Sequence, residues 1–377
     1  MRIGVDGGCW TNRRGYGRYL RELVAALARI DQTNEYVVFL DSGADRTEPW
    51  PAPFEPRFVP TRIETAQAAR ADGRRSIPDL LRMSRAVSRE RFDVFFFPSV
   101  YSYFPLLGGP PALVGVHDTI AENFPQHAFA SRSQERNWRA KVRLALWQAR
   151  RCLTVSEYSR RSIERVYRFP PARIDVVHEA AAALFQPSAE PREDFVLYAG
   201  GISPSKNLPV LVDAFARMQQ RTPDTQLVLA GDYRGDRFRG CYGELAAQVA
   251  SLGLGERVRF TGYVPDPELA SLYRRARLFA MPSLDEGFGL PAVEAMACGA
   301  PVVVSSGNAL EEVVGDAGLA VPSHDATALS RAMDRIFADP ALASELSAKA
   351  VARARQFSWD GTARSVLAAL ERTRAEG

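Results

Sequence analysis

Residues 279–304, FAMPSLDEGFGLPAVEAMACGAPVVV, constrain the fold of this chain more than any other stretch. They predict a strand, a loop, a helix and a second strand. The apolar run 278–281 stops at Pro282, as a buried parallel strand would. Pro291 suits the first turn of a helix and Gly299 suits its end. A strand–helix–strand unit of this kind is typical of a parallel sheet covered by helices.

The loop inside this unit carries groups suited to a ligand. Asp285 and Glu286 precede the run Gly287-Phe288-Gly289, and Glu294 follows within about one turn of the helix start. Glycines let the backbone approach a ligand, and a helix start points free N–H groups at an anion. Carboxylates on both sides of such a turn predict a nucleotide sugar, which has hydroxyls at both ends and phosphate between them. The alternative is a structural unit with two solvated glutamates.

The alternation of strands and helices continues on both sides of a polar, proline-bearing segment, QPSAEPRED, at 186–194. This segment is the best candidate linker. A chain of 377 residues is long enough for two domains. The sequence therefore predicts an α/β protein of two doubly wound Rossmann-like domains, 1–185 and 186–357, which face each other across a central cleft.

Lys206 stands in the motif GGISPSKN, which follows a predicted strand of the second domain and precedes a helix. The chain has only three lysines, so the position of each is informative. A flexible ammonium suits a diphosphate leaving group. The alternative is a surface lysine at a helix start, but that end of the helix dipole is itself positive.

The first domain offers two candidate ligand groups. Gly15 and Gly17 lie at a strand-to-helix turn, where backbone amides can meet phosphate, although plain turn chemistry explains them equally well. His117 stands at the carboxyl end of a predicted strand, the edge where parallel sheets bind ligands. It can act as a base, hydrogen-bond a sugar hydroxyl, or serve as a structural histidine. Because His127 and His178 show no ligand spacing, we expect no metal role.

Two further segments of the first domain lead to predictions. The basic segment 131–150 predicts a long helix with a solvated face over a core stripe, and such a helix can also lie on an anionic lipid surface. Residues 43–78, rich in Pro, Arg and Gly, predict an irregular and mobile excursion.

Composition excludes several classes of protein. A net charge of +4, from 48 basic and 44 acidic residues, gives no support for a nucleic-acid partner. The four dispersed cysteines indicate neither a disulfide framework nor a zinc site. No secretory leader and no apolar run long enough to cross a bilayer are visible. We therefore expect a cytoplasmic protein, with peripheral contact to the inner face of the plasma membrane as an added expectation.

Taken together, these motifs resemble the retaining GT-B glycosyltransferases of family 4. The resemblance rests on the E-x7-E element Glu286…Glu294 in EGFGLPAVE, with ACGAPVVVSS behind it and FTGYV and GISPSKN before it. The opening GYGRYLREL, VHD at 116–118 and TVSEYSR at 154–160 also match. The similarity extends over nearly the whole chain.

The resemblance implies roles for single residues. The catalytic group would be Glu286, which contacts the hydroxyls of the donor sugar, His117 near the reacting sugar, and Lys206 as the cation of the diphosphate. Glu294 would hold the ribose, and Tyr263 and Val264 would line the nucleobase pocket. The full donor-binding set would be Gly15, Gly17, Gly200, Lys206, Tyr263, Val264, Glu286, Phe288, Gly289, Leu290 and Glu294. A final segment, 358–377, would cross back to the first domain as a helix.

The resemblance also implies an activity. A hexose-type sugar would pass from a nucleoside-diphosphate sugar to a hydroxyl of a saccharide, lipid-linked or small-molecule acceptor, with retention of anomeric configuration. Polysaccharide, glycolipid or natural-product glycoside biosynthesis would be its setting. No cofactor is expected, and no metal, because the chain lacks a D-x-D triplet.

Two departures from the family pattern keep alternatives open. Gly201 and Ser205 occupy places where many members carry an arginine, and 176–185 lack the usual asparagine–glycine pair. A non-catalytic GT-B subunit or a sugar-nucleotide-binding regulatory protein is therefore the main alternative. A nicotinamide- or PLP-dependent enzyme is a weaker one, since no full G-x-G-x-x-G fingerprint occurs.

Overall fold

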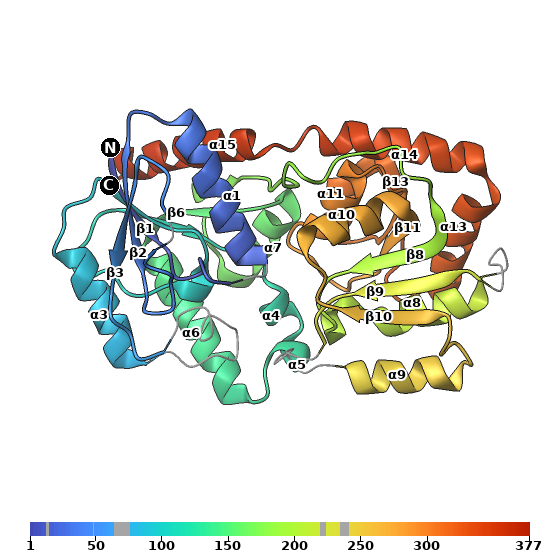
Figure 1. Cartoon of the computed structure of the whole chain (residues 1–377). Helices are drawn as coiled ribbons and strands as arrows, with labels where there is room; N and C mark the ends of the chain where they lie inside the picture. The colour runs from blue at the N-terminus through green and yellow to red at the C-terminus, as the bar shows by residue number, and fades with distance from the viewer. Residues whose placement is uncertain (13–14, 48, 64–75, 219–223, 234–240) are drawn as a thin grey trace. The chain divides into compact units, whose positions relative to one another are not determined.

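The computed structural model describes residues 1–12, 15–47, 49–63, 76–218, 224–233 and 241–377 (Figure 1). The chain forms two compact units. One consists of Met1–Glu179 together with Trp359–Gly377, and the other of Ala180–Ser358. Each unit holds a parallel sheet with helices packed against it, so the predicted pair of Rossmann-like domains is confirmed.

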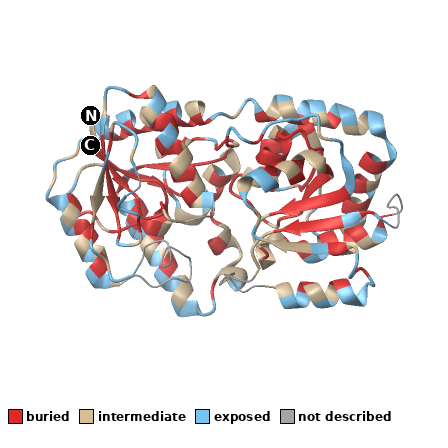
Figure 2. Cartoon of the chain, in the orientation of Figure 1, coloured by how far each residue is buried: buried red, intermediate tan, exposed pale blue. Residues whose placement is uncertain are grey.

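The sheet of the first unit has the strand order β3-β2-β1-β4-β5-β6-β7, and every pair in it is parallel. Its strands are β1 Arg2–Asp6, β2 Glu35–Leu40, β3 Phe54–Phe58, β4 Val94–Phe97, β5 Ala112–Gly115, β6 Ala149–Thr154 and β7 Ile174–Val176. The central strand β4, VFFF, is apolar at every position because both faces of the sheet are covered. Figure 2 shows this buried core as the red strands of the unit.

Helices cover the first sheet, with short 3-10 turns between some of the elements. The helices are α1 Gly15–Ile30, α3 Ile77–Ser88, α4 Ile120–Asn123, α5 Pro125–Ala128, α6 Arg132–Gln148, α7 Glu157–Tyr167 and α15 Trp359–Ala375, and the 3-10 turns are η1 Val100–Ser102 and η2 Pro171–Arg173. The start of α7 shows local control by sequence. The Ser156 side chain accepts a hydrogen bond from the Ser159 amide at 3.0 Å and so caps the helix.

Two predictions for the first unit were wrong in part. The expected irregular excursion 43–78 contains the edge strand β3, which pairs with β2 and includes Pro56. Proline is tolerated at a sheet edge, where its missing N–H breaks no ladder, and this is why its presence misled the prediction. Residues 48 and 64–75 of that segment lie outside the described residues. The helix expected over 131–150 ends at Gln148, and β6 begins directly after it.

The sheet of the second unit has the order β10-β9-β8-β11-β12-β13, again with parallel pairs throughout. Its strands are β8 Glu193–Ala199, β9 Gln226–Ala230, β10 Val258–Gly262, β11 Ala276–Met281, β12 Val302–Ser305 and β13 Gly318–Val321. Its helices are α8 Leu208–Arg217, α9 Tyr242–Ser251, α10 Asp266–Arg275, α11 Leu290–Ala297, α12 Ala309–Val314, α13 Ala326–Ala338 and α14 Pro340–Ala354, with 3-10 turns η3 Pro204–Lys206 and η4 Gly315–Ala317. The unit predicted from residues 279–304 is confirmed as β11, α11 and β12.

The C-terminal helix α15 belongs to the first unit. It packs against α1, and the Asp360 carboxylate accepts a hydrogen bond from Arg29 at 2.6 Å. Near its end, Arg372 donates to Asp175 at 2.8 Å. Within the described residues, no helix is both long and apolar enough to cross a membrane.

The compact units divide between Glu179 and Ala180, whereas the sequence places the boundary between 185 and 186. The intervening residues pack on the second unit, where the rings of Phe185 and Tyr273 lie 5.8 Å apart. The expected linker is also fixed to that unit, because Glu190 accepts from Arg274 at 2.8 Å. A polar composition thus marks a surface segment here, but not a free tether.

Candidate functional site

The loops after β8 and β11 lie side by side at the carboxyl edge of the second sheet. Strand β8 sits between β9 and β11, so the chain crosses to opposite sides of the sheet from this point. In open parallel sheets, the crevice at such a switch point is the usual ligand site. The two loops are tied directly, because the Leu284 amide donates to the Ser205 carbonyl at 2.9 Å. The motif GISPSKN and the motif DEGFG therefore form one site.

Lys206 and Glu286 meet in this site. The Lys206 Nζ lies 2.7 Å from the Glu286 Oε1, and the two side chains are 21% and 9% exposed. Sequence reasoning proposed both as catalytic residues, and the fold brings them into contact across 80 positions of the chain. A cation and a carboxylate in contact can separate to take an anion and a hydroxyl, respectively, from one ligand.

Two buried asparagines that the sequence analysis missed hold the Glu286 loop in place. Asn207, at a φ of 57°, donates from Nδ2 to the Pro282 carbonyl at 3.0 Å. From the other side, Asn308 donates to the Ser283 carbonyl at 3.2 Å and caps α12 through its Oδ1. Both asparagines stand directly before helices in the sequence, and that position was the available signal.

Gly289 fixes the start of α11. Its φ of 93° is a left-handed conformation that favours glycine. A Cβ at this position would also lie 2.2 Å from the Leu310 Cδ2. The helix begins here without a side-chain cap and without an acidic residue in its first turn. Pro291 has no N–H, and the amides of Ala292 and Val293 both donate to the Gly289 carbonyl. The Leu290 amide is therefore the group at this helix start that is placed to face an anion.

Phe288, predicted as a backbone donor to the diphosphate, has a structural role as well. Its side chain is 3% exposed, and its ring lies edge-on to that of Phe357 at 5.5 Å. Anchoring of this ring fixes the position of the neighbouring peptide groups.

Glycines also end two of the neighbouring strands. Gly200 follows β8 with a φ of 148°, and its amide donates to the Ala230 carbonyl. Gly231 follows β9, and a Cβ there would lie 1.8 Å from the Gly200 carbonyl oxygen. The Gly231 amide donates in turn to Gly262 at 3.1 Å. Gly231 was missed by sequence reasoning, and the close approach of the two loops explains why it is a glycine.

The remaining predicted residues of the second unit lie around the same sheet edge. Glu294 is 2% exposed on α11, and its Oε2 accepts from the Tyr273 hydroxyl at 3.2 Å. Tyr263 follows β10 and is 59% exposed, with half-buried Val264 beside it. An exposed aromatic ring at this edge is suited to stacking on a flat ligand.

His117 follows β5 in the first unit and is 7% exposed. Its Nδ1 lies 3.1 Å from the Glu179 Oε1, and its Nε2 lies 2.9 Å from the Pro98 carbonyl oxygen. Both partners are acceptors, so a doubly protonated ring satisfies both contacts. Burial lowers the pKa of His117, but the hydrogen bond and charge of Glu179, with help from Pro98 and Asp118, outweigh it and raise the pKa above 6.5. This environment favours an imidazolium cation over a general base.

Glu179, like Asn207, Asn308 and Gly231, was missed by the sequence analysis. It stands in the stretch where the family's asparagine–glycine pair was expected, and it is 8% exposed. Two tyrosines lie near His117 and Glu179. The Tyr19 ring lies edge-on to His117 at 4.7 Å, and the Tyr16 hydroxyl donates to Asp118 at 3.0 Å. The departure from the family pattern at this point therefore supplies the partner of His117.

The contact between His117 and Glu179 predicts that the stability of the folded protein depends on pH. Because the pKa of His117 in the folded protein lies above its unfolded value, the stabilisation is complete below about pH 6.5 and is lost as pH rises through the folded-state pKa. At pH 6 we expect Glu179→Gln to lower the free energy of unfolding by about 1–3 kcal/mol relative to the unaltered protein. This difference between the two proteins should become smaller at alkaline pH. Thermal unfolding over a pH series measures it. Glu256→Gln, at an exposed turn, is the control, and a difference independent of pH would contradict the prediction.

Gly15 and Gly17, predicted at a strand-to-helix turn, lie in the first turn of α1 and differ in their surroundings. A Cβ at Gly17 would lie 1.7 Å from the Asn12 carbonyl oxygen, so packing alone requires glycine there. Gly15 is exposed, and a Cβ there would meet nothing within 4 Å. Arg13 and Arg14, which directly precede this turn, lie outside the described residues.

A metal site was not expected from the sequence. Across the described part of the chain, no group of three or more His, Cys, Asp or Glu side chains is arranged to hold a metal ion.

Two family models match consecutive parts of the sequence. The model described as Glycosyltransferase Family 4 matches residues 13–180, and the model described as Glycosyl transferases group 1 matches residues 181–357. O-antigen chain mannosyltransferase B of Escherichia coli is 33% identical over 263 residues, which cover 66% of this chain and 67% of that protein. D-inositol 3-phosphate glycosyltransferase of Jonesia denitrificans is 38% identical over 202 residues, 52% of this chain and 47% of that protein.

Solved structures share the fold over the full length. Sucrose-phosphate synthase from Thermosynechococcus elongatus superposes with a TM-score of 0.80 at 23% identity and covers 100% of both chains. HepE from Anabaena, in complex with UDP-glucose, superposes with a TM-score of 0.73 at 20% identity and covers 99% of this chain and 100% of that one. At these identities, the likeness shows the fold.

Proposed function

We propose a sugar transfer reaction for this chain, which belongs to the glycosyl transferases of group 1. A hexose-type sugar moves from a nucleoside-diphosphate sugar to an acceptor hydroxyl with retention of anomeric configuration. The observation that carries the proposal is the contact of Lys206 with Glu286 at the switch point of the second sheet, beside the uncapped start of α11. This arrangement offers a cation and the Leu290 amide to a diphosphate, and a carboxylate to the attached sugar.

The proposed reaction breaks the bond between the anomeric carbon and the diphosphate oxygen, through a transition state with oxocarbenium character. Lys206 and the Leu290 amide at the start of α11 stabilise the negative charge that develops on the departing diphosphate. Glu286 accepts hydrogen bonds from the sugar hydroxyls and orients the ring. The acceptor oxygen attacks the face that the diphosphate leaves, and its proton passes to the leaving phosphate. The residues themselves supply the positive charge, so the proposal includes no metal ion.

The substrates are proposed from the relatives. The E. coli relative is named a mannosyltransferase, so mannosyl donors are the first to test. The other relative is named for D-inositol 3-phosphate, which places a phosphorylated small molecule beside saccharide and lipid-linked acceptors in the test panel.

A thermal-shift screen with UDP, GDP, TDP and ADP tests donor binding. A nucleotide that binds only the folded state at 100 times its dissociation constant adds about 2.7 kcal/mol to stability. We expect one base to raise the melting temperature, and Lys206→Ala to lose most of this rise with the diphosphate but little of any rise with the nucleoside alone. Lys349→Ala, which removes a 43% exposed lysine of α14 in the same unit, is the matched control.

A transfer assay with the matching sugar nucleotides tests the chemistry. The coupling constant of the anomeric proton in the product, measured by NMR, is expected to show the same configuration as the donor. Chelation of metal ions should leave the rate unchanged. A protein that binds no nucleotide and neither transfers nor hydrolyses any donor would instead be a non-catalytic member of the family.

A further inference from the structure

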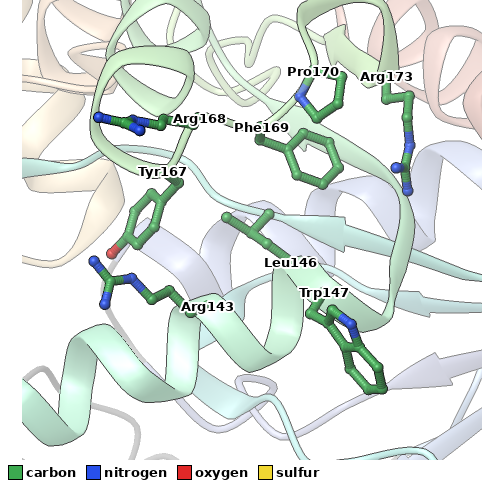
Figure 3. Close-up of a pocket in the computed structure, with 8 residues that line it drawn as sticks. All are labelled: Arg143, Leu146, Trp147, Tyr167, Arg168, Phe169, Pro170 and Arg173. Carbon is green, nitrogen blue, oxygen red and sulfur yellow. The ribbon is translucent and has the colours of Figure 1, made fainter.

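A surface pocket of about 280 Å³ lies on the first unit between α6 and the segment that follows α7 (Figure 3). Figure 3 shows Arg143 and Leu146 on α6 on the side of the run from Tyr167 to Arg173, while the Trp147 ring projects from the same helix away from that run. The residues that line it are Arg143, Leu146, Trp147, Tyr167, Arg168, Phe169, Pro170 and Arg173. They include three arginines and no carboxylate.

The three arginines of the pocket differ in whether their guanidinium groups already have partners within the protein. Arg173 donates to the carbonyl oxygens of Ala149 and Arg150, and its guanidinium lies 5.0 Å from the centre of the Phe169 ring. Its side chain therefore forms a fixed wall. Arg143 and Arg168 are exposed, and among the described residues neither guanidinium group makes a hydrogen bond or an ion pair; the Arg168 backbone amide donates to the Glu164 carbonyl. Figure 3 shows the Tyr167 ring between these two guanidinium groups, so each can pair separately with a phosphate oxygen at the rim of the pocket.

Trp147 projects beside these cations with 79% of its side chain exposed, and Leu144 is 40% exposed one turn earlier. The core-facing side of α6 is formed instead by buried residues such as Trp138 and Val142. The exposed face of α6 therefore carries apolar groups that its own unit does not cover. An indole needs an environment with both apolar and polar character, as the boundary between lipid headgroups and acyl chains provides.

Charge on α6 favours an anionic partner. The helix sequence RSQERNWRAKVRLALWQ contains five basic residues and one acidic residue. That single carboxylate, Glu135, is paired with Arg139 at 2.8 Å. Exposed Arg136 extends the cationic stripe toward the start of the helix. The net charge of the whole chain is only +4, so this face is distinctly more basic than the average surface.

We propose that this face is a docking site for an anionic phospholipid membrane. Lipid phosphates pair with the exposed guanidinium groups of Arg143 and Arg168 at the rim of the pocket, while Trp147 and Leu144 insert at the level of the headgroups. The sequence alone predicted membrane contact for a basic helix, and the pocket now assigns that contact to one face and one end of α6. The inference does not rest on the proposed sugar transfer, and its test involves no sugar donor.

Vesicle sedimentation of the full chain tests the proposal. We expect binding to phosphatidylglycerol mixed with phosphatidylcholine, at least about tenfold stronger than to phosphatidylcholine alone, and weakening as salt rises. A basic residue at an anionic surface strengthens binding about fivefold, so Arg143→Gln combined with Arg168→Gln should lower the partition about 25-fold. The charge-matched control, Arg331→Gln with Arg355→Gln, changes two exposed arginines of the second unit and should have little effect.

Tryptophan fluorescence reports insertion directly. The chain has five tryptophans, and Trp147 is the exposed one among those whose side chains are described. We expect a blue shift of the emission on addition of anionic vesicles, and its loss in Trp147→Ser together with weaker sedimentation. Leu252→Ser removes a 42% exposed leucine of the second unit and should change neither signal.

Three outcomes would overturn the proposal. One is equal binding to neutral and anionic vesicles, and another is an equal loss in the control variants. The third is release of the protein from vesicles by soluble glycerol phosphate at the same phosphate concentration, which would identify a site for a free phosphate ester.

Discussion

Lys206→Ala should lower the rate of sugar transfer by about 100-fold to 1000-fold, the range found when one group that stabilises a developing anion is removed. The Lys206 ammonium is in contact with Glu286 at the sheet edge, so the substitution removes a positive charge from the proposed donor site itself. Substrate binding should weaken less than the rate falls, because the charge on a diphosphate is greatest as it departs. Steady-state kinetics that separate kcat from KM give the measurement.

Loss of the fold is the alternative explanation of such a result, and two further variants address it. Lys206→Arg keeps a positive charge and should retain more activity than Lys206→Ala, although its planar group meets Glu286 differently. Glu286→Gln keeps a hydrogen-bond acceptor but removes the negative charge, and it should also nearly abolish transfer. Because the two residues are in contact, the effects of Lys206→Ala and Glu286→Gln should not add in the double variant. Folded variants that both keep most of their activity would contradict the assignment of the site.

Gly289→Ala should abolish most of the activity and lower the free energy of unfolding by about 1–3 kcal/mol. Two causes act together. Alanine is strained at a φ of 93°, and its Cβ would lie 2.2 Å from the Leu310 Cδ2. Relief of the clash requires movement of the α11 start or of α12, and movement of α11 displaces the Leu290 amide that is proposed to face the diphosphate. Chemical denaturation and the transfer assay measure the two effects.

Gly243→Ala separates this effect from the general cost of replacing a glycine. Gly243 lies in α9 of the same unit, is exposed, and has nothing within 4 Å of an added Cβ. Alanine is the better helix former by about 1 kcal/mol, so this variant should be unchanged or more stable and fully active. Equal loss in both variants would mean that position 289 has no special geometry.

The sequence determined the fold class and most of the unit around Glu286. The signals that predicted this unit are local in the sequence: apolar runs ended by proline, a proline suited to a first helical turn and a glycine after the helix. The bounds of β11, α11 and β12 agree with them. The edge strand β3 escaped prediction because Pro56 is compatible with a sheet edge as well as with a loop. Composition also could not distinguish a linker from a surface segment held by Glu190.

Contacts between distant residues were decided by the tertiary structure alone. Glu179 meets His117 across 62 positions, and Lys206 meets Glu286 across 80, distances over which no periodicity in the sequence specifies a partner. Asn207 and Asn308 likewise resemble ordinary helix caps until the fold places the loop after β11 between them. The physical reason is that parallel strands align their carboxyl ends whatever their order in the chain. Local sequence therefore places each group at that edge, and only the order of strands in the sheet decides which groups become neighbours.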